Sequence, residues 1–310
     1  MGLPRCLKTA NRATPLPQGS HAQIRAPNER TGMGKRPSSI QDVRSFWDRR
    51  PCNIRHSAKP VGTREYFDEV EARKYFVEPH IPAFAQFSRW AGKTVLEIGC
   101  GIGTDSINFV RAGACLTAVD LSPRSLAVCR QRFEVFGLKA DFYEGSAEEL
   151  SSLLPPTQFD LIYSFGVIHH TPHPERVFAE IEKFCGPTTE VRVMLYSKWC
   201  WKVLWVILRY GKGAFWRAAD LTRQYSEAQT GSPVTYCYSF RNVRALMKDF
   251  DIVDMRKDHI FPYVISEYVH YRYRLAWYFR WMPRCLFAWL ERRLGWHTLV
   301  VAIPKRWQGR

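Results

Sequence analysis

A short run in the first third of the chain constrains the fold more than any other feature. Residues 95–105 read VLEIGCGIGTD, so a β-rich apolar segment ends in three glycines at alternate positions and continues into a helical pattern. Glycine lets a ligand come close to the main chain, and the first N–H groups of the following helix have no partner inside that helix. The run predicts a strand, a nucleotide-binding turn and a helix in succession.

The sequence beyond this turn alternates between short β-rich runs and helical stretches. Strands separated by helices are typical of parallel βαβ units, so we expect an α/β fold with a doubly wound, Rossmann-like sheet. The expected strands are 94–98, 115–120, 139–143, 159–165 and 190–196. The helices between them are expected at 105–112, from Ser122 and Pro123 onward, at 147–153 and at 174–185.

The rest of the chain is less regular. We expect a helix at 239–250, a strand at 251–256 and a final strand at 296–304. Two long segments, 197–238 and 259–295, lie between these elements, and segments of that length inside a compact domain are usually functional lids.

Three parts of the chain differ in composition. The first forty residues are rich in Pro, Gly, Ser and Arg and contain a single acid, Glu29, so residues 1–44 are expected to form a disordered basic leader. Residues 45–92 show a helical pattern and are expected to form an N-terminal helical cap. Residues 93–310 form the main domain, with the two long segments as insertions.

Charge is distributed unevenly between these parts. The formal net charge of +16 comprises +9 in residues 1–60, −6 in residues 61–190 and +13 in residues 191–310. Nine of the eleven tryptophans also follow residue 190. An ordinary globular core is therefore flanked by two basic segments.

Several classes of protein are disfavoured. No apolar run exceeds six residues, which excludes a membrane-spanning helix, and the start of the sequence lacks the apolar core of a secretory signal. The nine cysteines are scattered, without the paired spacing of zinc sites or disulfide frameworks. We therefore expect no metal site and a reducing, cytoplasmic compartment.

The glycine spacing separates two kinds of nucleotide ligand. A dinucleotide-binding turn reads G-x-G-x-x-G, whereas Gly103 follows Gly101 by only two residues and Thr104 stands where that pattern has glycine. Glu97, two residues before the first glycine, suits a ligand with an ammonium group better than a pyrophosphate. This combination favours S-adenosylmethionine over a nicotinamide dinucleotide.

Asp120 supports the same ligand at the end of the second strand. A carboxylate there suits both hydroxyls of a ribose. The alternative is that Asp120 caps the helix that begins near Ser122, and the two roles are compatible.

The run from 95 to 196 resembles class I S-adenosylmethionine-dependent methyltransferases, in the broad group that includes ubiquinone- and menaquinone-pathway enzymes. The resemblance covers about a third of the chain and rests on the glycine turn, the two carboxylates and the fourth-strand motif DLIYSFGVIHH at 160–170. It implies S-adenosyl-L-methionine as cofactor and a seven-stranded, mostly parallel sheet with sixth and seventh strands at 251–256 and 297–303, the seventh antiparallel. The cofactor-binding residues that it implies are Glu97, Gly99, Cys100, Gly101, Gly103, Asp120, Leu121, Ser146, Ala147, Ser164 and Phe165.

The resemblance also assigns roles within this set. The loop 99–103 would hold the methionine end of the cofactor, with Cys100 as a small filler. Ser146 stands where the family often has an acid for the adenine amino group, so its hydroxyl or the Ala147 N–H would substitute. The end of the fourth strand would lie near the transferred methyl group.

Histidines after the fourth strand are the candidate catalytic groups. His169 and His170 are expected either to act as a general base or to shape the pocket floor, since alignment alone supplies much of the rate of methyl transfer. Tyr196 and His259 are weaker candidates, and His173 is expected to start a helix.

The two aromatic-basic segments leave the carboxyl edge of the sheet and are expected to cover the substrate mouth. Three interpretations stay open for them: a substrate lid or core packing, membrane-surface contact through 264–294, and stacking on single-stranded nucleic acid. Nucleic acid is disfavoured because no RNA-binding module pattern is present.

The sequence therefore predicts a class I methyltransferase that acts on an O, N or C atom of a small or amphipathic acceptor. The alternatives are an RNA-modifying methyltransferase, a non-catalytic interaction protein that keeps the cofactor fold, and transfer of the aminocarboxypropyl part of the same cofactor.

Overall fold

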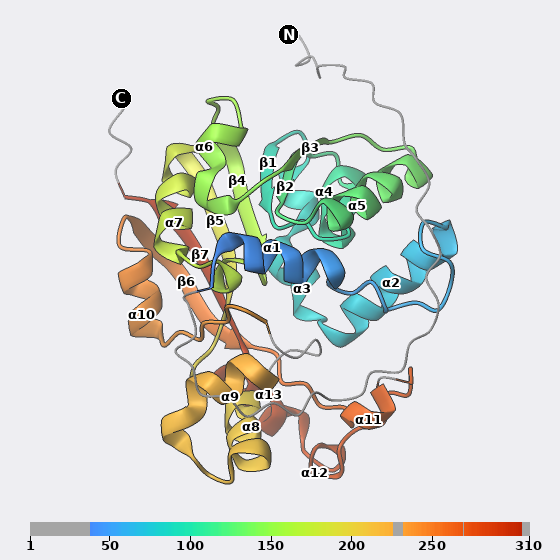
Figure 1. Ribbon diagram of the computed structural model, residues 1–310, viewed down its shortest axis with the longest axis vertical. Coiled ribbons are helices and arrows are strands. Elements are labelled where there is room, and N and C mark those ends of the chain that lie inside the picture. Colours follow the sequence, from blue (N-terminus) through green and yellow to red (C-terminus); the bar gives the residue numbers. More distant parts are fainter. Residues whose placement is uncertain (1–37, 226–231, 269, 306–310) are drawn as a thin grey trace. The chain divides into compact units, whose positions relative to one another are not determined.

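The computed structural model describes residues 38–225, 232–268 and 270–305, and its centre is a seven-stranded sheet of order β3-β2-β1-β4-β5-β7-β6 (Figure 1). Strand β7 runs antiparallel to both of its neighbours, and the other neighbouring strands are parallel. The predicted doubly wound sheet with an antiparallel last strand is confirmed. The strands are β1 (Thr94–Ile98), β2 (Cys115–Asp120), β3 (Asp141–Glu144), β4 (Phe159–Phe165), β5 (Cys185–Tyr196), β6 (Phe250–Asp258) and β7 (His297–Pro304).

Helices follow the predicted alternation with the parallel strands, and further helices precede β1 and follow β5. Those before β1 are α1 (Ile40–Arg49), α2 (Arg64–Val77), α3 (His80–Ala85) and the 3-10 turn η1 (Phe87–Trp90). Those between the parallel strands are α4 (Thr104–Arg111), α5 (Pro123–Phe136), η2 (Ala147–Glu149), α6 (Leu150–Leu153), η3 (Ile168–His170) and α7 (Pro174–Lys183). Those after β5 are α8 (Trp201–Gly211), η4 (Phe215–Arg217), α9 (Ala218–Tyr225), α10 (Phe240–Leu246), α11 (Ile265–Tyr268), α12 (Trp277–Arg280) and α13 (Arg284–Leu294).

Helix α5 shows how the local sequence sets such boundaries. Ser122 is its N-cap and accepts a hydrogen bond from the Ser125 N–H at 3.0 Å, while Pro123 fills the first helical position. Gly137 ends the helix with a φ of 66°. A hydroxyl at the N-cap, proline in the first turn and glycine past the last turn each favour the helical boundary that they occupy. The predicted start of this helix is confirmed.

The apolar core lies on both faces of the sheet. Leu161 belongs to the cluster on one face and its neighbour Ile162 to the cluster on the other, and both are fully buried. Successive residues of a strand point to opposite faces, so a strand covered on both sides is apolar throughout. Since helices cover both faces, the ends of the strands are left for ligands.

Two predicted elements differ from the observed ones by more than two residues at one end, and the other predicted strands and helices after residue 93 agree within two residues. The predicted strand 190–196 is too short, because β5 begins at Cys185, which pairs with Phe159 before a register shift brings Glu190 opposite Leu161. The predicted helix 239–250 is too long, because the chain leaves the helix after Leu246 and Phe250 already pairs with Pro304 of β7.

The two long segments contain helices rather than open loops. Figure 1 shows α8, α9 and α13 together beyond the end of β5. Trp201 of α8 lies 6.3 Å from Phe279 of α12 (ring centroids) and joins an apolar cluster that also includes Phe287 of α13. The two segments therefore pack against one another. Among the described residues, no helix combines the length and the apolar character needed to cross a membrane.

The predicted leader spans residues 1–44, and its residues 1–37 lie outside the described part of the chain. Helix α1 begins at Ile40, inside the range assigned to that leader. Its N-cap, Ser39, forms a capping box with Asp42, which is a strong local signal for a helix start.

Candidate functional site

The glycine turn connects β1 to α4 at the carboxyl edge of the sheet. Gly99 has a φ of 78°, and a Cβ there would lie 2.2 Å from a methyl carbon of Val167, so only glycine fits. Gly101 has a φ of 53°, and a Cβ there would meet no atom within 4 Å. The middle of the turn therefore faces open space, where a ligand can approach the main chain.

Asp120 ends β2 beside this turn. Its Oδ2 accepts a hydrogen bond from the Gly101 N–H at 2.7 Å, and its Oδ1 accepts one from the Ser122 N–H at 2.8 Å. Burial raises the pKa of Asp120 to about 6, although both hydrogen bonds act in the opposite direction. The alternative role predicted for Asp120, capping α5, is wrong, because the N-cap of that helix is Ser122, whose own N–H donates to Asp120. The carboxylate instead fixes the shape of the turn.

Glu97 lies on β1 under the turn and is buried. Its Oε2 accepts a hydrogen bond from the Ser106 hydroxyl at 2.5 Å. Burial raises the pKa of Glu97 to about 8, and the nearby Asp105 acts in the same direction. A buried carboxyl of this kind ionises more readily when a cation lies beside it.

A charged network that the sequence analysis missed surrounds Glu97. Asp105 of α4 accepts hydrogen bonds from Lys74 Nζ at 2.8 Å and from the hydroxyls of Tyr75 and Tyr163 at 3.0 Å each. The Lys74 side chain also lies 5.9 Å from the centre of the Phe165 ring. Lys74 and Tyr75 belong to α2, whose sequence pattern gave no sign that they would reach the site.

Helix α1 lies along the same edge of the sheet. Asp48 Oδ1 accepts hydrogen bonds from the Ser122 hydroxyl at 3.0 Å and the Arg124 N–H at 2.9 Å, just after β2. Arg44 forms an ion pair with Glu144 at the end of β3. The Trp47 ring lies 5.0 Å from the His170 ring, after β4. Helix α1 therefore bridges three strand ends.

The residues predicted to meet the adenine lie at the end of β3. The Ser146 hydroxyl accepts a hydrogen bond from the Glu148 N–H at 3.1 Å, so it caps η2. Ala147 is buried in an apolar core cluster that also contains Leu150 of α6. Leu121, after β2, is partly exposed. Ser146 and Leu121 follow neighbouring strands, so the structure brings them to the same edge.

The remaining predicted cofactor residues differ in their surroundings. Ser164 is buried and donates a hydrogen bond to the Ile98 carbonyl oxygen at 3.0 Å, which ties β4 to β1. Phe165 ends β4 in an aromatic cluster with Tyr163 and Phe84. Cys100 is buried, and its hydrogen bond with Cys129, together with burial, holds the pKa of its thiol well above the usual range.

The three predicted catalytic residues pack against one another. The His169 ring lies 3.7 Å from the Tyr196 ring and 4.4 Å from the His170 ring, by centroids. Both ring nitrogens of His169 are buried without a hydrogen-bond partner among the described residues, and burial holds its pKa well below the usual range. His170 Nδ1 lies 2.8 Å from the Val234 carbonyl oxygen, to which it donates.

His259 lies outside this group, with His80 and His297. Their rings lie within 5.1 Å of one another by centroids, close to Phe165. His173 is the N-cap of α7, as predicted. No sequence signal grouped His80 or His297 with the site. His80 belongs to α3 and His297 to β7, and the two residues are 217 positions apart in the sequence.

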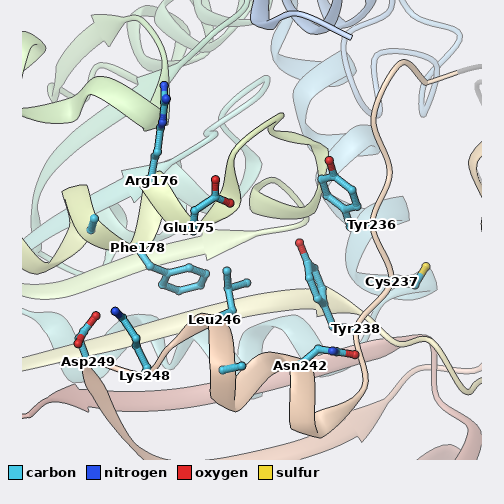
Figure 2. A pocket seen from close by; sticks show the side chains of 12 residues that line it. Glu175, Arg176, Phe178, Tyr236, Cys237, Tyr238, Asn242, Leu246, Lys248 and Asp249 are labelled. Carbon is cyan, nitrogen blue, oxygen red and sulfur yellow. The ribbon is translucent and has the colours of Figure 1, made fainter. Parts of the chain in front are cut away.

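A groove lies elsewhere, between α7 and α10. It has a volume of about 770 Å³, and Phe178, Tyr238 and Leu246 contribute to its apolar lining (Figure 2). Among the described residues, its lining includes none of the glycine-turn, Asp120 or histidine positions. We therefore place the candidate site at the strand ends, where the polar groups converge, and not in this groove.

Comparison with known proteins identifies the segment that carries the turn. Residues 95–188 match a family described as a methyltransferase domain. The ubiquinone biosynthesis O-methyltransferase of Aromatoleum aromaticum is 36% identical over 101 residues, which are 33% of this chain and 43% of that protein. The enzyme of the same name from Azotobacter vinelandii is 30% identical over 119 residues, covering 38% and 48%. The chain thus spans less than half the length of these curated relatives.

Solved structures share the fold over a longer stretch. The magnesium protoporphyrin IX methyltransferase of Synechocystis PCC 6803 with bound SAH has a TM-score of 0.53 and 14% identity, covering 86% of this chain and 99% of that one. The [4+2]-cyclase SpnF has a TM-score of 0.52 and 16% identity, covering 89% and 100%. At these identities the likeness establishes the fold alone.

Proposed function

Because this chain carries a class I, S-adenosylmethionine-dependent methyltransferase domain, we propose that it transfers a methyl group from S-adenosylmethionine to an O, N or C atom of a small or amphipathic molecule. The observation that carries the proposal is the contact between the glycine turn and Asp120, which supports a nucleoside at the adjoining ends of β1 and β2.

The residues of the turn fit such a cofactor. The open space at Gly101 admits the methionine end close to the main chain, and the N-terminus of α4 suits a carboxylate. Glu97 suits the ammonium group, since a cation beside a buried carboxyl restores its charge. When bound, S-adenosylmethionine supplies a methyl group activated on a sulfonium.

Asp120 is proposed to bind the ribose. Each of its carboxylate oxygens already accepts one backbone N–H and keeps the capacity to accept a further hydrogen bond. Its two backbone hydrogen bonds hold the carboxylate in place before the ligand arrives. Ser146 and the Ala147 N–H are proposed to meet the adenine, with Leu121 against the base.

The acceptor is proposed to lie at the ends of β4 and β5. Phe165 ends β4, which neighbours β1, His170 lies in η3 just after β4, and Tyr196 ends the next strand, β5. These three residues would bound its pocket. The proton on His170 Nδ1 is directed to the Val234 carbonyl oxygen, which orients the ring. His169 would act as pocket floor rather than as base, because a base whose pKa lies well below neutrality is a weak proton acceptor.

Calorimetry with S-adenosylmethionine and S-adenosylhomocysteine tests the cofactor assignment. Asp120→Ala should weaken binding by about 10- to 100-fold, because hydrogen bonds to a charged group contribute about 1.5–3 kcal/mol. Asp141→Ala, an exposed carboxylate on the neighbouring β3, is the matched control and should bind normally. The assignment would be overturned if Asp120→Ala bound the cofactor as tightly as the unaltered chain does, or if a nicotinamide dinucleotide displaced the ligand.

A screen for the acceptor uses the intact chain and radiolabelled cofactor. Quinols, phenols and amines are offered in turn, and the mass gain of one methyl group is measured. Transfer to an oxygen, nitrogen or carbon atom is expected. Transfer of the aminocarboxypropyl group instead would contradict the proposed reaction while leaving the cofactor site intact.

We also propose that residues 264–294 contact an anionic membrane surface. Trp277, Trp281 and Trp289 are 79%, 82% and 54% exposed, and arginines lie among them on α12 and α13. Together, 197–238 and 259–295 hold twelve Lys or Arg and four Asp or Glu. Exposed tryptophan mixed with basic residues suits the interface of a bilayer with anionic lipids, and it would bring an amphipathic acceptor to the site.

A further inference from the structure

A second cluster of polar side chains lies beside the proposed acceptor position. His80 begins α3, His259 follows β6, and His297 begins β7. Glu78 lies between α2 and α3. One ligand atom each from Glu78, His259 and His297 lies within 4.8 Å of the other two, and His259 and His297 are buried. Elements from both ends of the chain thus bring two imidazoles and a carboxylate to one point.

The hydrogen bonding of His297 fits that of a metal ligand. His297 Nδ1 lies 3.0 Å from His80 Nε2, so one of these nitrogens donates to the other. When His297 donates from Nδ1, its Nε2 keeps a lone pair, and this atom lies 3.8 Å from Glu78 Oε1. Histidines that bind metals usually donate their other ring N–H to a neighbour that fixes the ring. His80 would be that positioning residue.

Metal binding needs neutral imidazoles. His259 and His297 are buried, and burial disfavours the charged form of an imidazole. Neutral imidazoles keep a lone pair for coordination. The half-buried Glu78 supplies the negative charge that offsets part of a dication.

The cluster adjoins the end of β4. The Phe165 ring lies 5.9 Å from the His80 ring and 5.6 Å from the His297 ring, and the Tyr196 ring lies 6.0 Å from that of His297. These are the residues proposed to bound the acceptor pocket. A group bound at the cluster would therefore lie next to the proposed acceptor position.

We propose that Glu78, His259 and His297 bind one divalent transition-metal ion, best matched by Zn²⁺, which holds an oxygen atom of the acceptor. Two histidines, one carboxylate and an open fourth position form a typical set for a catalytic zinc. The ligand atoms of tetrahedral zinc lie roughly 3.4 Å apart, so the three side chains close in by about an ångström on binding.

The role in methyl transfer rests on the proposed function. An acceptor hydroxyl bound at the metal loses its proton to water more readily, because a metal ion stabilises the oxyanion. The oxygen then forms a bond to the methyl carbon as the bond from that carbon to the sulfonium sulfur breaks. The products are the methyl ether and S-adenosylhomocysteine. The proposal narrows the acceptor class to oxygen nucleophiles such as phenols and catechols.

Metal binding is tested on the full chain after treatment with a chelator. Zn²⁺ is titrated by calorimetry and Co²⁺ by its visible absorption, with metal content measured by mass spectrometry. One equivalent with micromolar or tighter affinity is expected. His259→Gln and Glu78→Gln should each weaken binding at least tenfold, whereas His173→Ala, an exposed histidine outside the cluster, and Cys285→Ser, an exposed thiol, should not.

The open position is tested with 4-nitrocatechol, whose absorption shifts when its oxygens coordinate a metal. A shift is expected with the metal-loaded protein and not with the metal-free protein or with His259→Gln. Circular dichroism and S-adenosylhomocysteine affinity, expected to be normal in these variants, verify the fold.

Less than one fifth of an equivalent of bound metal, or unchanged binding in His259→Gln, would overturn the metal site. Loss of binding in Cys285→Ser would overturn it as well, because a surface thiol would then be the ligand. Absence of the catechol shift would overturn the acceptor role. Failure of the proposed function is distinguishable, since S-adenosylhomocysteine would then not bind even where the metal does.

Discussion

The carboxyl edge of the sheet is built in two different ways. Within the glycine turn itself the polar contacts join residues near each other in the sequence, as Asp120 accepts from Gly101 and Ser122, 19 and 2 residues away. Beyond β4 the contacts join distant segments: His80 meets His297 across 217 residues, and Arg73 donates to the Tyr268 carbonyl oxygen across 195.

This difference coincides with two proposed tasks, cofactor binding and acceptor binding. The part of the proposed cofactor site formed by the glycine turn and Asp120 comes from a short stretch of the chain. The acceptor side depends on α2 and α3 from one end and on β6, β7 and α11–α13 from the other. Lys74 connects the two, because it pairs with Asp105 under the turn and lies near Phe165 at the acceptor position. On the proposed assignment, we expect changes to the acceptor side to alter the substrate without altering the cofactor.

The largest expected effect comes from removing the link between the two regions. Asp105→Ala leaves Lys74 buried without its partner, and breaking a buried ion pair in this way costs about 3–5 kcal/mol. Chemical denaturation should show this loss in the free energy of unfolding.

The exposed Asp251→Ala should change that free energy by less than about 0.5 kcal/mol. The double variant Lys74→Met, Asp105→Leu should recover part of the loss, since it removes both charges. A cost below about 1 kcal/mol for Asp105→Ala would mean that the two regions are independent.

A smaller effect is expected from the acceptor side alone. Replacing Trp277, Trp281 and Trp289 together by serine should weaken binding to vesicles of phosphatidylcholine and phosphatidylserine at least tenfold, or about 1.4 kcal/mol. Cofactor affinity should stay unchanged. Vesicle sedimentation measures the first quantity and calorimetry the second.

Val253→Ser removes an exposed apolar side chain of β6, outside this surface, and serves as control. Undiminished sedimentation of the triple variant would contradict the membrane proposal. Steeply salt-dependent RNA binding that the triple variant loses would point to nucleic acid instead.

The smallest effect concerns the pH dependence of the cofactor region. The pKa of Glu97 is about 8 in the folded protein against an ordinary 4.5, so between these values the folded state holds a proton that the unfolded state has lost. Stability contributed by that proton is present below pH 4.5 and is lost as the pH rises through about 8. Between pH 7 and 8 the free energy of unfolding should fall by about 1 kcal/mol.

Glu97→Gln should flatten this slope, because the amide does not titrate. The exposed Glu134→Gln should leave the slope as it is. Thermal unfolding at pH 7.0, 7.5 and 8.0 in the absence of cofactor provides the measurement. A slope of the same size in Glu97→Gln would assign the titration to another group.

Local signals account for the part of the fold that was predicted. The limits of β1, β2 and β4 follow from β-rich runs that end at glycine or aspartate, and Ser122 and Pro123 mark the start of α5. The start of β5 was not predictable in the same way, because residues 185–190 pair with β4 only through a register shift. Such irregular pairing has no sequence period.

The residues of the candidate site also fall into a group that local sequence signals predict and a group that they do not. The turn and Asp120 follow from spacing within some twenty residues, and the structure places them in contact. Lys74, His80 and His297 carry no local mark of function, since α2, α3 and β7 meet only through the packing of the whole domain. The scattered histidines therefore gave no reason to expect a metal ligand set.

Helix α1 has a consequence for the catalytic cycle. It is anchored near β2 by Asp48, at β3 by Arg44 and after β4 by Trp47. One helix thus contacts both the proposed nucleoside position and the proposed acceptor position. A movement of α1 would therefore change the surroundings of the proposed cofactor and acceptor positions together.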